Sequence, residues 1–181
     1  MANILLSMKK FIFLLIVLNF KSVLCQNINT LDVKYGISKF KLGSSLSDHI
    51  SNLTYNYKLG NLTNYTYNKK DINIILSNVV ITKIDLMYYK NKLYNISIYF
   101  PDEFNNKENM LQDLNKLFGK PTDEFYNLRF NKDIYYYWKY QWESKKTLMS
   151  YEHSESSVEG NTISLFIYSK IIEAQKINDQ F

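Results

Sequence analysis

The stretch VVITKIDLMYYKNKLYNISIYF, residues 79–100, decides the fold, because apolar and polar side chains alternate along both of its halves. In the first half, from Val79 to Tyr89, one face holds Val80, Ile84, Leu86 and Tyr88. After a polar turn at Lys90-Asn91-Lys92, the half from Leu93 to Phe100 places on one face Tyr94, Ile96, Ile98 and Phe100. A period of two on both sides of a short turn predicts a β-hairpin.

A helix is predicted directly after this hairpin. Pro101-Asp102 ends the second strand, and Asp102 can cap a helix whose N-terminal end also carries Glu103 and Glu108. Gly119 suits the left-handed position after a helix, and Pro121 forbids its continuation. The core-facing stripe would consist of Phe104, Leu111, Leu114 and Phe118, with Met110 and Leu117 beside them.

Three more strands are predicted in the C-terminal part of the chain. They run from Ile134 to Trp142, Lys146 to Glu152 and Thr162 to Ser169. A short link, Glu143-Ser144-Lys145, and the polar loop from Ser154 to Asn161 would join them as a three-stranded antiparallel meander. Residues 171–180 predict either a short terminal helix or a frayed tail.

The segment before the hairpin predicts a short strand and a short helix. Residues 37–42 alternate like a strand, and SSLSDHISNL, residues 44–53, follows. Ser44 or Ser45 can cap a two-turn helix, and if Ser45 is the cap, Asp48 can complete a capping box. The apolar face would hold Leu46, Ile50 and Leu53. Residues 54–70, rich in Asn, Tyr and Thr, predict only a loose strand or a loop.

Together these elements predict an α+β fold: an antiparallel β-sheet, formed by the hairpin and the three-stranded meander, with two helices packed on one face. Residues 35–181 are enough for one globular domain with its own core. Residues 26–34 are polar and aperiodic, so we expect a linker there.

Residues 1–25 have the features of a cleavable secretory signal peptide. Lys9-Lys10 supplies positive charge, FIFLLIVLNF at 11–20 is the apolar run, and SVLC at 22–25 is the cleavage site. The apolar run is too short to cross a bilayer, since a spanning helix needs about 20 apolar residues. We therefore expect a secreted or periplasmic protein without a transmembrane anchor.

Cys25 is the only cysteine, and two processing routes compete for it. Cleavage after Cys25 leaves Gln26 as the new N-terminus, whereas a bacterial lipoprotein signal would make Cys25 the lipidated first residue. Leu24 is not the small residue that a lipoprotein signal needs, so simple secretion is favoured over a lipid anchor. In both cases the mature domain has no thiol for a disulfide.

The charge pattern argues against a nucleic-acid partner. The formal net charge of +5 falls to +2 once Lys9, Lys10 and Lys21 leave with the signal. Arg129 is the only arginine, and the lysines are scattered among acids rather than collected in a stripe.

No pattern of catalytic or metal-ligating residues stands out. His49 and His153 are the only histidines, and neither lies at metal-ligand spacing from a second ligand. The serines lack a nucleophile-elbow pattern. The nearby acids Glu152, Glu155 and Glu159 lie where no buried acid/base pair is expected. We predict no metal, no cofactor and no enzymatic activity.

The aromatic run YYYWKYQW, residues 135–142, is the best candidate for a binding surface. If this run is a strand, the side chains that face the core are those of Tyr136, Trp138, Tyr140 and Trp142. Its other face would hold Tyr135, Tyr137, Lys139 and Gln141. Two outward tyrosines beside a lysine and an amide suit protein binding or sugar stacking. The alternative is ordinary surface tyrosine in a tyrosine-rich chain.

Four Asn-x-Ser/Thr sequons begin at Asn52, Asn61, Asn64 and Asn95. In a eukaryotic secretory pathway they would mark surface positions for glycans, although an Asn-rich chain contains several by chance. Asn95 falls opposite the apolar face of its predicted strand, which is consistent with exposure.

Two segments, FKLGSSLSDHISNL at 40–53 and LQDLNKLFGKPT at 111–122, resemble small exported bacterial modules of the BamE and beta-lactamase-inhibitor-protein type. In those modules a Leu-Gly step leads into a short helix that packs on an antiparallel sheet, and a helix ends in an aromatic-Gly-x-Pro step. The resemblance implies a non-catalytic protein-binding role and carries over no binding residue.

The function expected from the sequence is therefore an exported, non-catalytic module that binds a protein partner through a sheet face. One alternative is binding of a glycan or cell wall through Tyr135 and Tyr137. Another is a hydrolase whose site combines His49 with acids from the sheet.

Overall fold

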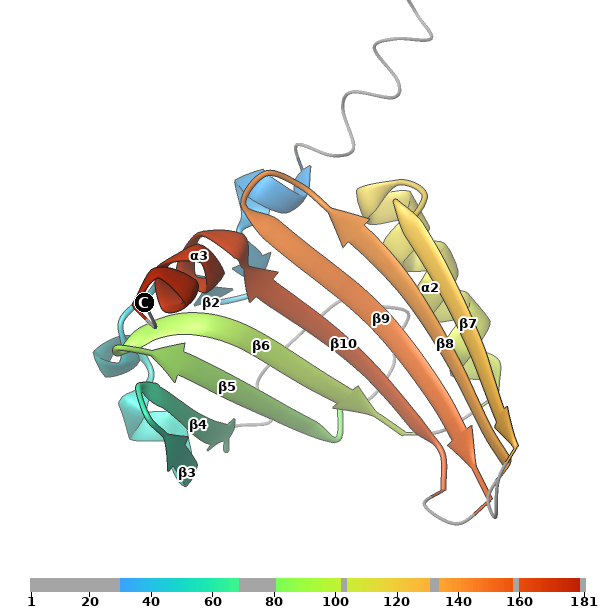
Figure 1. Ribbon diagram of the computed structural model, residues 1–181, viewed down its shortest axis with the longest axis horizontal. Helices are drawn as coiled ribbons and strands as arrows, with labels where there is room; N and C mark the ends of the chain where they lie inside the picture. Colours follow the sequence, from blue (N-terminus) through green and yellow to red (C-terminus); the bar gives the residue numbers. More distant parts are fainter. Residues whose placement is uncertain (1–29, 69–80, 102–103, 131–133, 158–159, 180–181) are drawn as a thin grey trace, which may run out of the picture.

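The computed structural model describes residues 30–68, 81–101, 104–130, 134–157 and 160–179. In this part of the chain the fold is mostly β, with one eight-stranded antiparallel sheet and one two-stranded sheet (Figure 1). The predicted signal peptide, with Cys25 and Gln26, lies outside the described residues.

Two antiparallel meanders form the large sheet. The first consists of β3 (Leu53–Leu59), β4 (Leu62–Tyr67), β5 (Lys83–Tyr89) and β6 (Lys92–Phe100). The second consists of β7 (Asp123–Phe130), β8 (Ile134–Glu143), β9 (Thr147–Ser156) and β10 (Thr162–Ser169). The strand order is β3-β4-β5-β6-β10-β9-β8-β7, so the last strands of the two meanders pair in the middle and their first strands form the edges. The small sheet pairs β1 (Gly36–Ile37) with β2 (Phe40–Lys41).

The helices lie on opposite faces of the large sheet, which corrects the predicted arrangement. Figure 1 shows α2 (Phe104–Phe118) behind the sheet and α3 (Lys170–Asn178) in front of it. The expected α+β fold with two helices on one face is wrong, because the fold is mostly β and residues 44–53, the first of the two predicted helices, form no α-helix. The sheet is larger than predicted because residues 54–67 and 123–130 form strands, and the C-terminal helix covers the other face.

Strand β7 was not predicted, and residues 54–67, predicted as either a loose strand or a loop, lie in β3 and β4. All three strands lie at or next to the sheet edges. In β3, Tyr55, Tyr57 and Leu59 are all exposed. The edge strands β3 and β7 each pair with one neighbour and are largely exposed, so their sequences need not alternate between apolar and polar residues. The predicted three-stranded meander therefore has a fourth strand, β7.

The predicted hairpin is confirmed as β5 and β6, with Ile84 opposite Ile98. Lys90 and Asn91 form its turn with φ values of +46° and +63°, the positive values of a type I′ turn, whose twist matches that of the flanking strands. Val79 and Val80 lie outside the described residues.

A β-bulge in β6 reverses the predicted orientation of Tyr94. Tyr88 pairs with Leu93 and Met87 pairs with Asn95, so Tyr94 is the extra residue between them. Leu93 therefore joins the main core, whereas Tyr94 packs with Ile172 of α3 on the other face. The prediction that Tyr94 shares a face with Ile96 is wrong.

Helix α2 ends at Phe118 as predicted, with Gly119 at φ +81°. Met110, Leu114 and Phe118 are buried against the sheet, but Leu117 is exposed and does not belong to the stripe. The predicted cap Asp102 lies outside the described residues.

The segment after Ser45 keeps the predicted cap but not the predicted helix. Ser45 and Asp48 form the capping box. Two short 3₁₀ turns, Leu46–Asp48 and Ile50–Asn52, take the place of the amphipathic α-helix, and Ile50 is exposed rather than packed on the core.

Folding begins earlier than the predicted linker allows. Residues 30–34 are helical, and Leu31 lies in the main core at 3% exposure. One apolar residue in a polar segment gives no periodicity, so it could not be distinguished from a linker by pattern.

The main core lies between α2, the segment up to Leu46 and the rear face of the sheet. Its fully buried side chains include Phe40, Leu86, Leu93, Ile96, Met110 and Leu165. A smaller cluster of Tyr89, Tyr94 and Ile172 lies under α3 on the front face.

Candidate functional site

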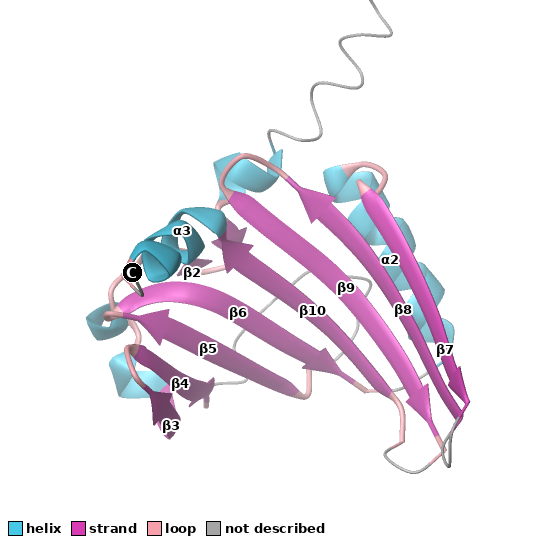
Figure 2. Cartoon of the chain, viewed as in Figure 1, coloured by secondary structure: helices cyan, strands magenta, loops and turns pink. Residues whose placement is uncertain are grey.

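The front face of the large sheet is the candidate site, and we call it the open face. Helix α3 covers only its end near the start of β6, and most of β8, β9 and β10 is uncovered in the view of Figure 2. Neighbouring strands contribute residues to the same face when they are paired in register. The open face can therefore be traced from strand to strand.

The predicted binding residues of β8 all belong to the open face. Tyr137, Lys139 and Gln141 lie directly opposite Ser154, Glu152 and Ser150 of β9. Tyr135 lies opposite Ser156. The structure thus brings Tyr135, Tyr137, Lys139 and Gln141 together on one face, as the alternation of the strand predicted, and all four are partly exposed.

Tyr137 is the central aromatic residue of this half of the open face. Its ring stacks on that of Tyr135 at 6.3 Å between centroids and meets Phe125 of β7 edge-on at 6.1 Å. Burial raises the pKa of the Tyr137 hydroxyl, and the nearby carboxylate of Glu152 raises it further. The hydroxyl is therefore neutral at physiological pH and donates a hydrogen bond to the Glu152 carboxylate.

Lys139 is not a free cation, because its Nζ lies 3.5 Å from a carboxylate oxygen of Glu152.

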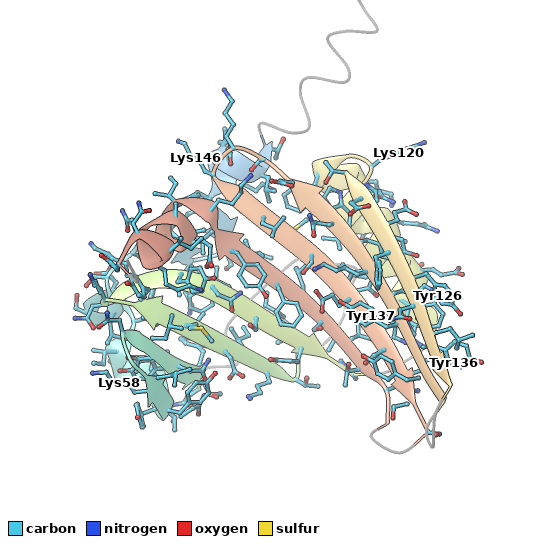
Figure 3. All side chains as sticks on the ribbon, in the orientation of Figure 1. Lys58, Lys120, Tyr126, Tyr136, Tyr137 and Lys146 are labelled. Atoms are coloured by element: carbon cyan, nitrogen blue, oxygen red, sulfur yellow. The ribbon has the colours of Figure 1, made fainter. Side chains whose placement is uncertain are left out.

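Figure 3 shows Tyr137 over the face turned to the viewer and Tyr126 and Tyr136 at the β7 side of the sheet. Phe125 and Tyr126 are adjacent and equally exposed, at 52% and 53%, but they face opposite sides of the sheet because Phe125 pairs with Lys139 and Tyr126 with Trp138.

A polar pocket of about 500 Å³ lies on the other half of the open face, between strands β3 to β6, β10 and helix α3. Four of its polar residues are buried: Asn64, Asp85, Asn95 and Ser97. Tyr99, Phe166 and Tyr168 add partly buried rings. Burial, followed by the charge of Glu152, raises the pKa of Tyr168 to about 12.

The sequence did not predict this pocket. A signal was present in β6, where Asn95 and Ser97 alternate with the core residues Ile96 and Ile98. The pairing of β6 with β10, which adds Phe166 and Tyr168, joins segments far apart in the chain and has no local signal.

On the rear face, the predicted core set of β8 is only partly interior. Trp142 is buried and donates from Nε1 to the carbonyl oxygen of Gly119 at 2.7 Å. Tyr136, Trp138 and Tyr140 are partly exposed. The last two line a groove of about 260 Å³ beside α2.

The two histidines have separate surroundings. His49 packs edge-on against Phe40 at 5.3 Å, with Nε2 3.4 Å from the Ser44 hydroxyl. His153 stacks on Trp138 at 4.9 Å, and its Nε2 lies 3.4 Å from Glu155. Among the described contacts of His49 there is no acid from the sheet, so the hydrolase hypothesis gains no candidate base and acid pair.

The acids that lie close in sequence are separated by the sheet. Glu152 faces Lys139 on the open face, whereas Glu155 binds Lys107 of α2 at 2.8 Å on the rear side. Glu159 lies outside the described residues. Within the described ranges, no group of three or more His, Cys, Asp or Glu side chains could hold a metal ion.

The four sequons differ in exposure. Asn61 is exposed and Asn52 is partly exposed, but Asn64 and Asn95 are buried at 6% and 4% exposure. The expected exposure of Asn95 is therefore wrong: its side chain is on the face opposite the core, as predicted, but it lies at the floor of the polar pocket.

No helix among residues 30–68, 81–101, 104–130, 134–157 and 160–179 has the length and apolar character needed to cross a membrane. Comparison of the chain with protein-family models, with curated proteins and with solved structures found no match.

Proposed function

We propose that this chain is an exported, non-catalytic binding protein that holds a protein partner on the open face of its sheet. The observation that carries the proposal is the aromatic cluster of Phe125, Tyr135 and Tyr137, which meet at centroid distances of 6.1 and 6.3 Å on a face that α3 covers only at one end. Rigid aromatic side chains supply large contact areas at small entropic cost and dominate protein-binding surfaces.

The charges of the open face indicate what kind of surface the partner presents. Lys139 is paired with Glu152, and Lys83 with Asp85 at 2.6 Å. Internal pairing leaves little net charge to attract a strongly charged partner. The proposed partner therefore presents uncharged polar groups and an apolar side chain that packs on Phe125 and Tyr137.

Export is the second part of the proposal and rests on residues 1–25. The positively charged and apolar segments have the lengths of a signal peptide. Expression of the full chain in a secretory host, followed by mass spectrometry of the exported protein, tests it. We expect a mature N-terminus at Gln26. Retention of the full-length chain in the cytoplasm would contradict export.

A photocrosslinking amino acid at position 125 or 126 tests the binding face. These adjacent positions have equal exposure and opposite orientation, so each is the control of the other. We expect one cross-linked protein from the extracytoplasmic fraction of the native host with the crosslinker at 125 and not at 126. The Tyr137→Ala variant should lose that product. Equal products at both positions, or none at 125, would overturn the proposal.

Glycan binding is a second candidate, favoured by the nearly parallel rings of Tyr135 and Tyr137, whose planes differ by 10°. The two stacked rings form a continuous aromatic patch against which a saccharide chain can pack. A glycan array, or sedimentation with cell walls, compares the wild type with the Tyr135→Ala/Tyr137→Ala variant. Equal signals from both proteins would remove this candidate.

A further inference from the structure

The polar pocket under α3 has features of a ligand site that the aromatic cluster of β7 and β8 lacks. It is an open hollow of about 500 Å³, a size typical of small-molecule sites. It lies on the half of the open face formed by β3 to β6 and β10. Its ligand is independent of the protein partner proposed above.

Asn95 is the residue that points to a ligand. Its side chain is 4% exposed and lines the pocket, and its Oδ1 accepts a hydrogen bond from the Ser97 hydroxyl at 2.8 Å. Its Nδ2 is buried and has no acceptor within strict hydrogen-bond geometry among the described residues. A looser side-chain hydrogen bond joins the Asn95 amide to the Tyr168 hydroxyl and opposes the rise in the pKa of that hydroxyl. A buried donor without an acceptor is costly, so an acceptor from a ligand would stabilise it.

The charged groups of the pocket are paired within the protein. Asp85 binds Lys83 at 2.6 Å and accepts a hydrogen bond from the Thr66 hydroxyl at 2.7 Å. Lys176 binds Glu173 of the same helix at 2.9 Å. Each cation thus has its own carboxylate, so the pocket does not favour an anion. A neutral ligand that offers several hydroxyl groups suits this set of amides, hydroxyls and internally paired charged groups.

The rings of the pocket supply the apolar part of the site. Tyr94 and Tyr168 meet edge-on at 6.2 Å, and Phe166 stacks on Tyr168 at the same distance. Tyr99 meets Phe166 edge-on at 6.3 Å. Rings beside amide and carboxylate groups are complementary to a sugar ring, which has C–H groups on its faces and hydroxyls around its edge.

We propose that this pocket binds one neutral sugar residue. One of its hydroxyl oxygens accepts a hydrogen bond from Asn95 Nδ2, another hydroxyl donates to Asp85, and the sugar ring lies against Phe166 and Tyr168. Because Nδ2 is covered by neighbouring atoms, a side chain of the pocket wall turns when the sugar enters.

The experiment uses the mature chain and a panel of neutral methyl glycosides of glucose, galactose, mannose and N-acetylglucosamine, followed by NMR. The side-chain amide resonance of Asn95, assigned by its loss in Asn95→Ala, should shift as one glycoside is added. Asn95→Ala should lower the affinity for that glycoside about tenfold, the loss expected for one hydrogen bond to a buried group. The exposed sequon residue Asn61 supplies the matched control, since Asn61→Ala should leave the affinity unchanged.

A second variant keeps the test valid if Asn95→Ala fails to fold. Asn56 lies on edge strand β3, is exposed and lines the pocket, so the larger side chain of Asn56→Trp takes up space in the pocket without replacing a core residue. It should abolish glycoside binding while thermal unfolding stays cooperative. If no glycoside shifts the Asn95 amide, or if sodium phosphate shifts it and no glycoside does, the inference is overturned. Crosslinking at position 125 is unaffected by either result, so the protein-binding proposal stands or falls separately.

Discussion

The carboxylate of Asp32 accepts a hydrogen bond from the backbone N–H of Lys146 at 3.0 Å, across 114 positions of the chain. It also accepts one from the hydroxyl of Ser144, which is 6% exposed. Burial by itself raises the pKa of Asp32, but these hydrogen bonds outweigh burial and hold the pKa below its ordinary value. Asp32 thereby joins the N-terminal helical turn to the connection between β8 and β9.

Replacement of Asp32 should destabilise the whole domain. Asp32→Ala removes the acceptor of the hydrogen bonds from Ser144 and Lys146, and we expect the free energy of unfolding in urea to fall by about 1–3 kcal/mol. Asp123→Ala is the matched control, since Asp123 is exposed and, among the described residues, its side chain accepts a hydrogen bond from the N–H of the next residue. The control should stay within about 0.5 kcal/mol of the wild type. Equal losses of stability in both variants would contradict a specific stabilising role for the hydrogen bonds of Asp32.

The parts of the fold that the sequence predicted correctly are those with a local pattern. Residues 83–100 alternate with a period of two, and α2 has an apolar stripe and a Gly-x-Pro stop, so both were recognisable. The edge strands β3 and β7 have no such pattern, because most of their side chains are exposed on both faces of the sheet. Leu31 was missed for a related reason, since a single buried residue has no period.

The candidate site shows the same division. The outward set of β8 followed from alternation within one strand, and its four residues do share a face. The polar pocket depends on the pairing of β6 with β10, which brings Asn95 next to Tyr168. No local rule gives the partner of a strand in a sheet of this size, so the pocket could be found only in the structure.

A pH dependence of stability should come from His49. Burial lowers the pKa of His49. The negative charge of Asp48 opposes this shift, and the positive charge of Lys39 adds to it. Because the folded-state pKa lies below the unfolded value of 6.5, the unfolded chain binds more protons between the two values. The stability that His49 contributes is therefore fully present above pH 6.5. It declines as the pH falls through that value and changes no further below the folded-state pKa. Urea unfolding between about pH 8 and pH 5 measures it.

The His49→Gln variant isolates this contribution. It should lose part of the decline in stability on acidification while folding normally at neutral pH. If the wild type and His49→Gln lose the same stability over that pH range, His49 is not the responsible group.

Gly36 should tolerate no side chain. It has a φ of +141°, and a Cβ atom there would lie 2.1 Å from the carbonyl oxygen of Phe40, a fully buried residue that cannot easily move. We expect Gly36→Ala to cost about 3 kcal/mol or more, because steric overlap adds to backbone strain. At Gly60, also at positive φ, a Cβ atom meets nothing within 4 Å, so Gly60→Ala should cost only about 1 kcal/mol. Thermal unfolding of both variants tests the difference, and similar melting temperatures would contradict it.

Leu31 and Val33 give the sharpest test of where the domain begins. They lie two residues apart in the same helical turn, but Leu31 is 3% exposed in the main core and Val33 is 81% exposed. Leu31→Ala leaves a cavity beside the core and should lower the free energy of unfolding by about 2–4 kcal/mol. Val33→Ala should change it by less than about 0.5 kcal/mol. A loss of stability confined to Leu31→Ala would place the start of the folded domain at or before residue 31. If both substitutions are neutral in urea unfolding, residues 30–34 do not pack on the domain and the prediction of a linker there is correct.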